Sequence, residues 1–339
     1  MPTKTQTILR RATRSGKFHI LTFPTHERYE TNLAETNADF WAWRGQGIKD
    51  WNEKYAPLPS NYHLLDPQKG VGQIPLYVDF DCIISQSPLA HFNIAIQLAE
   101  QLDLPIINIH HTLPPPHFTL QQIQGVKEFI SPAVENIFIS EYNKREWGYE
   151  QNEGVVIKHA IDSDFWCPGE NERGNHVISV VNDWVNRDWC CGFKLWAQIV
   201  DYNNPRFPTL RVGDTPGFSE PANGPEDLRE KYRSSSVFIN TSLVSPIPMA
   251  LLEAMSCGCA CVSTDTCMIP EIITHGVDGF IYSPKNPDKF IAKIQELLNK
   301  PDYAREIGNN ASKKIQEMFC LQNFVDSWDV LYERVLNEN

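Results

Sequence analysis

The stretch VFINTSLVSPIPMALLEAMSCGCACVSTDTCMIPEIITHGVDGF, residues Val237–Phe280, decides the fold. Its pattern predicts a strand over Val237–Thr241, a helix over Met249–Cys257, and further strands over Cys259–Ser263 and Gly279–Tyr282. Short apolar and β-branched strands that alternate with helices are typical of α/β domains built on a parallel sheet. We therefore expect this part of the chain to form such a sheet with helices packed on it.

The same alternation continues on both sides of this stretch. It predicts the further strands Phe18–Phe23, Cys82–Ser85, Pro105–Ile109, Ile137–Ser140, Val155–Lys158, Val177–Val181 and Thr209–Val212. The polar segment Pro168–Asn175 separates a first cycle of strands and helices from a second. Two doubly wound domains joined by one linker are therefore expected to face a cleft. Because ligands of such sheets bind beyond the carboxyl ends of the strands, the cleft is the expected ligand site.

The composition limits the class of protein. The 339 residues are enough for two cores, and a hydrophobic fraction of 42% can fill them. A formal net charge of −12 argues against a nucleic-acid-binding protein, which needs a basic surface. No apolar run approaches the roughly 20 residues of a membrane-spanning helix, and Met1–Lys17 lacks the apolar core of a signal peptide. The nine cysteines are an odd number, so we expect reduced thiols in a cytoplasmic protein.

The N-terminal residues form a basic arm. Its positive charges, with no acidic residue among them, are Lys4, Arg10, Arg11, Arg14 and Lys17. The arm is either a solvated, frayed terminus or a segment attracted to an anionic surface, such as a membrane leaflet or a polyanionic acceptor. The second alternative would make the protein peripheral at the membrane or bring it to DNA.

Several spaced positions of Val237–Phe280 resemble the donor-binding core of retaining glycosyltransferase family 4, the glycosyl transferases group 1. The matching residues are Ser242, Leu251–Leu252–Glu253–Ala254–Met255, Cys257–Gly258, Pro270–Glu271–Ile272, Gly276 and Gly279. Weaker similarity runs through the C-terminal helices and back through ISEYNKREWG at residues 139–148 and HAIDSDFW at residues 159–166. The resemblance covers half of the chain well and most of the rest loosely.

The resemblance implies an α/β fold of the GT-B architecture, in which two Rossmann-like doubly wound domains face a cleft. Residues 1–168 would form the N-terminal, acceptor-side domain, and residues 169–320 the C-terminal, nucleotide-sugar-binding domain. Residues 321–339 would form a helix that crosses back and packs on the N-terminal domain.

The implied activity is that of a glycosyltransferase. It would move a hexose-like sugar from a UDP-, GDP- or ADP-sugar to a hydroxyl group of a glycan, lipid-linked or other acceptor, with retention of the anomeric configuration. We expect no cofactor and no metal, because no paired CxxC motif and no prominent DxD-type carboxylate pair occurs. Cys257, Cys259 and Cys261 alternate along a predicted strand and are expected to be small core residues.

The helix predicted to begin at Met249 suits a diphosphate, because its first N–H groups and the positive end of its dipole are available to an anion. Pro246 and Pro248 have no N–H group. The expected donors to the phosphates are therefore the backbone amides of Ile247, Met249 and Ala250.

Side chains around this helix complete the expected donor site. Glu253, one turn into the helix, can accept hydrogen bonds from the ribose diol, and Ser242 matches the strand-end serine of the family. Ser245 stands eight positions earlier than Glu253, where the family has a glutamate that contacts the transferred sugar. Arg187 and Lys194 would supply positive charge to the leaving diphosphate. We expect Ser245 and Arg187 at the reacting centre.

Three histidines are candidates in the first half of the chain. His110 ends the predicted strand Pro105–Ile109, in the position of the family's sugar-contacting histidine, and is expected at the reacting centre. His111 follows it, and His26 lies in the loop after Phe18–Phe23, where the family has a Gly-rich loop. Both are candidates for contact with the donor.

Two other functions stay open. A glycosyltransferase of the same fold could act on hydroxymethylated DNA bases, which the basic arm favours and the acidic total charge opposes. A catalytically degenerate nucleotide-sugar-binding protein is suggested by Ser245, Pro246 and Pro248, which replace a glutamate and a Gly-rich turn.

Overall fold

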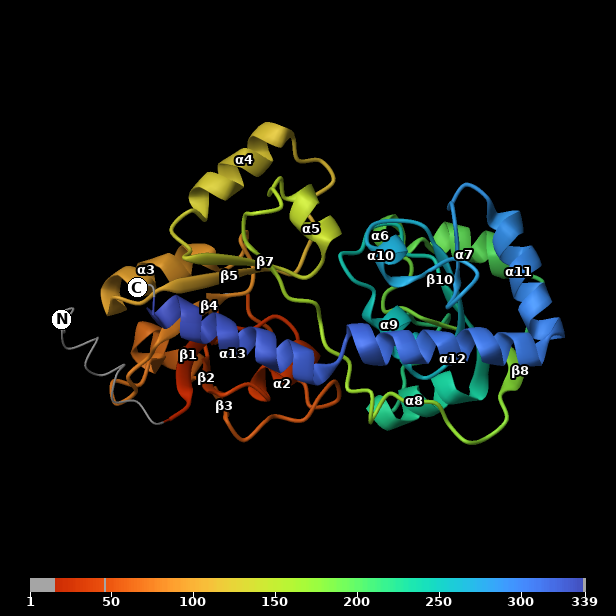
Figure 1. Cartoon of the computed structure of the whole chain (residues 1–339), viewed down its shortest axis with the longest axis horizontal. Coiled ribbons are helices and arrows are strands. Elements are labelled where there is room, and N and C mark those ends of the chain that lie inside the picture. The colour runs from red at the N-terminus through yellow and green to blue at the C-terminus, as the bar shows by residue number, and fades with distance from the viewer. Residues whose placement is uncertain (1–15, 46, 338–339) are drawn as a thin grey trace. The chain divides into compact units, whose positions relative to one another are not determined.

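The computed structural model describes residues 16–45 and 47–337, and within them the chain forms two units. The first unit holds the chain up to His159 together with the segment from Gln322 onward, and the second holds Ala160–Leu321. Figure 1 shows each unit as a sheet with helices packed on it. Of the basic arm only Lys17 is described, and it pairs with Asp39 at 3.2 Å; the other four charges lie outside the described residues.

The sheet of the first unit is parallel throughout, with the strand order β3-β2-β1-β4-β5-β6-β7 in its described part. Its strands are β1 (Phe18–Phe23), β2 (Ala38–Ala42), β3 (Tyr62–Leu64), β4 (Cys82–Ser85), β5 (Ile106–His110), β6 (Glu135–Phe138) and β7 (Val155–Val156). The helices are α2 (Glu27–Ala34), the 3-10 helix η1 (Pro67–Gln73), α3 (Phe92–Leu102), α4 (Leu120–Phe129), α5 (Glu141–Glu146) and α13 (Leu321–Asn337). Every residue of β4 and β5 is buried, as is usual where helices cover both faces of a parallel sheet.

Helix α13 brings the end of the chain to the first unit (Figure 1). The ring of Tyr332 lies 5.6 Å from that of Phe18 in β1, and the backbone N–H of Asn37 donates to Asp329 Oδ1 at 2.9 Å. Trp328 is fully buried. The aromatic face of α13 is therefore part of the core of this unit.

The second unit is also built on a parallel sheet, with the order β12-β11-β10-β8-β9. Its strands are β8 (Gly174–Val180), β9 (Thr209–Val212), β10 (Ser235–Asn240), β11 (Ala260–Thr264) and β12 (Phe280–Tyr282). The helices are α6 (Asp188–Cys191), α7 (Phe193–Val200), α8 (Pro225–Ser234), α9 (Met249–Ser256), α10 (Ile269–Ile272), α11 (Pro287–Asn299) and α12 (Pro301–Met318). The expected α/β class with two parallel sheets is confirmed. Cys257, Cys259 and Cys261 are fully buried, as predicted for core residues.

Helix α12 approaches the end of α9 very closely at one glycine. A Cβ atom added to Gly308 would lie 2.1 Å from the carbonyl oxygen of Gly258, which follows α9. One turn later, the hydroxyl group of Ser312 donates to the carbonyl oxygen of Ser256 at 2.9 Å. Gly308 therefore sets the distance between these two helices.

We expect Gly308→Ala to lower the free energy of unfolding by about 1–3 kcal/mol, because overpacking of this kind costs that much. At an exposed helical position the same change would raise the free energy of unfolding by up to about 1 kcal/mol. Urea denaturation followed by tryptophan fluorescence measures the difference. Asn309→Ala, at the exposed neighbouring position, is the matched control. Equal or greater stability of Gly308→Ala would contradict the close approach.

Candidate functional site

In the second unit, the loops that follow β8 and β10 are bonded to each other. The backbone N–H groups of Leu243 and Val244 both donate to the carbonyl oxygen of Cys190, at 2.7 and 3.2 Å. The hydroxyl group of Thr241 donates to the carbonyl oxygen of Cys191 at 2.9 Å. Since β8 and β10 are neighbours in the sheet, these bonds gather two predicted site segments at one edge, the carboxyl ends of the strands.

Gly192 permits this contact. Its φ is +70°, and a Cβ atom there would lie 2.1 Å from the carbonyl oxygen of Thr241. A side chain at position 192 would therefore push the two loops apart as well as strain the backbone.

Of the two predicted cations, Arg187 lies on the loop after β8 and Lys194 lies in the first turn of α7. Arg187 immediately precedes α6 and is exposed; its Nη1 donates to the carbonyl oxygen of Asn182 at 3.4 Å. The side chain of Lys194 is 85% exposed and pairs with Asp188 at 3.2 Å. The pKa of Asp188 is lowered, chiefly because its carboxylate accepts a hydrogen bond from the backbone N–H of Lys194. Arg187 thus has its charge free of any carboxylate among the described residues, whereas Lys194 shares its charge with one.

Helix α9 begins at the end of the loop that follows β10, which is the loop bonded to Cys190 and Cys191. Pro248 is its N-cap and has no side-chain bond to the helix, while its carbonyl oxygen accepts from the N–H groups of Leu251 and Leu252. Ile247 is buried, and Met249 and Ala250 are half-buried. No acceptor for the N–H groups of Met249 and Ala250 is present among the residues that the structure describes. These two amides are available to an anion.

Glu253 lies deeper than the sequence suggests. It is 2% exposed, and its Oε2 accepts from the hydroxyl group of Tyr232, in α8, at 3.1 Å. The carboxylate is therefore held inside the unit one turn below the free amides of α9. A ribose that reached it would have to bind beside or in place of the tyrosine hydroxyl group.

The two predicted serines differ in their bonding. The hydroxyl group of Ser242 donates to Asn240 Oδ1 at 2.8 Å, and its carbonyl oxygen accepts from Thr264 and Thr266 at 2.5 and 2.7 Å. Ser242 therefore shapes the loop. Ser245 is half-buried and its backbone N–H lies 3.5 Å from the sulfur of Cys267, a residue that the sequence analysis did not identify.

In the first unit, His110 and His111 lie in different surroundings. His110 is fully buried; its ring stacks on Phe138 at 4.4 Å, and its Nε2 lies 3.2 Å from Asn136 Oδ1. Burial lowers the pKa of His110 to about 3. His111 is half-buried at the carboxyl end of β5, so it is His111 that reaches the sheet edge, one residue after the histidine that the sequence favours.

The ring of His111 lies among other rings at this edge. It is 4.4 Å from Tyr29 and 5.7 Å from His159. Burial, followed by the nearby His159 and His26, lowers its pKa well below the ordinary value, so the ring is neutral at neutral pH. His26 is exposed at the N-cap of α2, where its Nδ1 accepts from the backbone N–H of Arg28 at 3.3 Å.

A buried carboxyl group lies beneath the same edge. Glu30 is 1% exposed, and it accepts from the hydroxyl group of Tyr62 at 2.8 Å, the side-chain amide of Gln86 at 2.9 Å and the backbone N–H of Thr25 at 3.2 Å. Burial raises the pKa of Glu30 to about 7. Sequence reasoning missed this residue because a glutamate in an amphipathic helix ordinarily faces solvent.

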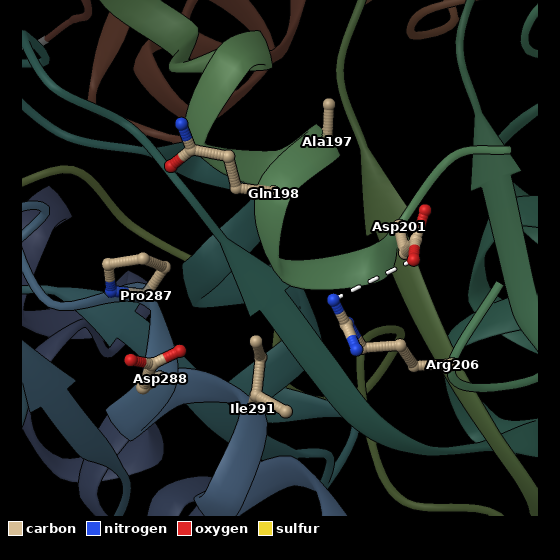
Figure 2. A pocket seen from close by; sticks show the side chains of 7 residues that line it. All are labelled: Ala197, Gln198, Asp201, Arg206, Pro287, Asp288 and Ile291. Carbon is tan, nitrogen blue, oxygen red and sulfur yellow. Dashed lines mark ion pairs between the residues drawn. The ribbon is translucent and has the colours of Figure 1, made fainter. Parts of the chain in front are cut away.

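Two surface hollows of the second unit contain none of the predicted site residues. Figure 2 shows the first, of about 370 Å³, between the end of α7 and the start of α11. Asp201 and Arg206 pair across it at 3.6 Å. It lies where α7 ends and the chain leads into β9, near the amino ends of the strands. The second, of about 410 Å³, follows the outer edge of β9.

The described residues show neither a cluster suited to a metal ion nor a helix suited to a membrane. No group of three or more His, Cys, Asp or Glu side chains there is placed to hold a metal ion. Within the same residues, every helix is too short or too polar to span a membrane.

Comparison with known proteins agrees with this geometry. Residues 212–314 match the glycosyl transferases group 1 family. An uncharacterized glycosyltransferase of Methanocaldococcus jannaschii is 30% identical over 112 residues, which cover 33% of this chain and 27% of that protein. The N-acetyl-alpha-D-glucosaminyl L-malate synthase of Bacillus anthracis is 26% identical over 249 residues, 69% of this chain and 58% of that protein. The chain thus spans less than two thirds of the length of these curated relatives.

A solved structure extends the likeness to nearly the whole chain. Anabaena HepE, solved in complex with UDP and glucose, has a TM-score of 0.72 with 15% identity, over 94% of this chain and 100% of that chain. The fold is therefore that of the GT-B glycosyltransferases, and residues 212–314 are similar to the glycosyl transferases group 1 family.

The titration of Glu30 gives a test of the buried cluster. Because its pKa is about 7 in the folded chain and 4.5 ordinarily, the folded state binds the extra proton between these values, and stability falls as the pH rises through them. Glu30→Gln removes this titration. Its free energy of unfolding relative to wild type should rise by on the order of 3 kcal/mol between about pH 4.5 and pH 8.

Urea denaturation at several pH values measures this change. Glu27→Gln, in the same helix and bonded instead to the backbone N–H of Asn52, is the control and should keep the wild-type profile. Parallel pH profiles for wild type and Glu30→Gln would show that Glu30 titrates normally.

Proposed function

We propose that this protein is a glycosyltransferase that moves a hexose-like sugar from a nucleoside-diphosphate sugar to a hydroxyl acceptor. The observation that carries the proposal is the pair of free amides at the start of α9, which lies in the segment that matches the glycosyl transferases group 1 family. The loop before α9 is hydrogen-bonded to the segment that holds Arg187. The second unit would take the nucleotide and the first unit the acceptor.

The leaving diphosphate is the charge that this arrangement suits. The N–H groups of Met249 and Ala250 and the positive end of the α9 dipole would bind one phosphate group. The Arg187 guanidinium, which can donate two parallel hydrogen bonds, would bind the other. Fixed donors directed at charge that develops in the transition state are usually the largest catalytic contribution. This supports a reaction without a metal ion, which we propose together with retention of the anomeric configuration.

The donor is best sought first among UDP-sugars. HepE was solved with UDP and glucose, and the Bacillus anthracis relative is named for an N-acetylglucosaminyl transfer. UDP-glucose and UDP-N-acetylglucosamine are therefore the first two candidates. Ser245 and the adjoining thiol of Cys267, both in the second unit, are the residues we propose near the transferred sugar, since the family's glutamate is absent at position 245.

A nucleotide-sugar-binding protein without transferase activity is the second candidate. The observation that favours it is that Ser245 offers a hydroxyl group where the family has a carboxylate, so no charge there would stabilise an oxocarbenium-like transition state. Binding of UDP-glucose or UDP-N-acetylglucosamine without turnover would support this candidate, and production of UDP with a new glycoside would exclude it.

Arg187→Ala should weaken UDP binding by about tenfold or more, because a hydrogen bond to a charged group contributes about 1.5–3 kcal/mol. Isothermal titration calorimetry with UDP measures the change. Arg206→Ala is the matched control, since Arg206 is at the other end of the sheet and pairs with Asp201. Equal affinities for the two variants would place the diphosphate elsewhere.

Glu253→Gln separates the ribose from the phosphates. If Glu253 binds the ribose diol, the variant should bind UDP about tenfold more weakly yet bind inorganic pyrophosphate as wild type does, because pyrophosphate has no ribose. Tyr232→Phe removes one hydroxyl group that donates to Glu253 and should leave the affinity for pyrophosphate unchanged. A parallel loss of both ligands in Glu253→Gln would show a structural role instead.

A further inference from the structure

A chain of hydrogen bonds runs from the buried carboxyl group of Glu30 to the ring of His111. Gln86, which follows β4 and is fully buried, joins the two. Its Nε2 donates to Glu30 Oε2 at 2.9 Å, and its Oε1 lies 3.0 Å from His111 Nε2. The links come from α2 and from the carboxyl ends of β4 and β5, which are neighbours in the sheet.

The direction of each bond follows from the carboxylate. An ionised carboxylate only accepts hydrogen bonds, so the NH₂ group of Gln86 must face Glu30 and its carbonyl oxygen must face His111. The second NH₂ hydrogen is used by Thr22 Oγ1 at 3.1 Å, and the carbonyl oxygen also accepts from the hydroxyl group of Thr25 at 3.2 Å. Gln86 can therefore only accept from His111, and His111 must carry its hydrogen on Nε2.

The other nitrogen of His111 faces a different environment. Nδ1 has no hydrogen-bond partner among the described residues, and the His111 residue is half-buried rather than fully buried. With the hydrogen on Nε2, a neutral ring offers a lone pair at Nδ1. With the hydrogen on Nδ1, the same atom would be a donor.

We propose that Glu30 is a positioning residue that acts through Gln86 to hold His111 as the Nε2–H tautomer, so that Nδ1 accepts a hydrogen bond from the hydroxyl group of the acceptor. The catalytic part of this inference rests on the proposed function. The tautomer itself does not, because it follows from bonds within the first unit.

Glu30→Gln should reverse the tautomer without changing the shape of the cluster. Oε1 of Glu30 faces the backbone N–H of Thr25, which cannot turn, so the carbonyl oxygen of the new glutamine must stay there. Its NH₂ group then faces Tyr62 and Gln86. Tyr62 can turn its hydroxyl group to accept, whereas Gln86 must turn its amide over. The NH₂ group of Gln86 then faces His111, and the hydrogen of His111 moves to Nδ1.

The nitrogen chemical shifts of ¹⁵N-labelled histidine report the tautomer directly. At about pH 8.5, above the pKa of Glu30, wild type should show His111 protonated on Nε2, and Glu30→Gln should show it protonated on Nδ1. The double variant Glu30→Gln, Gln86→Glu exchanges carboxylate and amide and should restore the Nε2–H form. Glu27→Gln should match wild type. The same tautomer in wild type and Glu30→Gln would overturn the proposal, as would Nδ1–H in wild type.

Turnover tests the catalytic part. Using whichever of UDP-glucose and UDP-N-acetylglucosamine wild type consumes, Glu30→Gln should lower kcat at least about tenfold with KM for the donor unchanged, and the double variant should recover kcat. A reversed tautomer with unchanged kcat would overturn the role of Nδ1. Absence of turnover in wild type would contradict the proposed function and this role with it, while the tautomer would still be decided by the nitrogen shifts.

Discussion

The bonds from Leu243, Val244 and Thr241 to the carbonyl oxygens of Cys190 and Cys191 hold the edge of the second unit together. They fasten the turn that begins α9 to the loop that bears Arg187. Without them the free amides and the guanidinium would belong to independent loops, and their separation would vary with each loop's motion. Backbone atoms make most of the contact, so several side chains can change without loss of the arrangement. Gly192 is the exception, because the approach leaves no room for a Cβ atom.

Several strands and helices of the second unit were predicted well because Gly or Pro marks one of their ends, as Pro208 and Gly213 do on either side of β9. Strand Thr209–Val212 and the start of the helix at Met249 agree with the structure at the residue. In the first unit, β3 (Tyr62–Leu64) is too short to show a period, and β2 (Ala38–Ala42) contains no β-branched residue, so neither was predicted. His110 is buried whereas the next residue, His111, is half-buried at the end of β5, and this difference depends on how the strand packs in the sheet, which the residue types alone do not reveal.

Neither Glu30 nor Gln86 could have been found from the sequence. Their importance arises from α2 and β4 meeting in space, 56 residues apart in the chain. The two units also differ in whether backbone N–H groups near the carboxyl ends of their strands are already hydrogen-bonded. In the first unit, the N–H group of Thr25 is already bonded to the Glu30 carboxyl group, whereas in the second unit the amides that begin α9 are left open. This difference is consistent with a diphosphate bound by the second unit and an uncharged hydroxyl group by the first.

The return of α13 to the first unit has a consequence for how the chain matures on the ribosome. The second unit is one continuous segment and can fold as soon as it has emerged, since domains generally fold as units during synthesis. The first unit emerges earlier but lacks Trp328 and Tyr332 until the whole second unit has been synthesised. Its apolar surface beside Phe18 therefore stays uncovered throughout synthesis of the second unit. That order makes the first-synthesised unit the last to be completed and the one most in need of protection from aggregation.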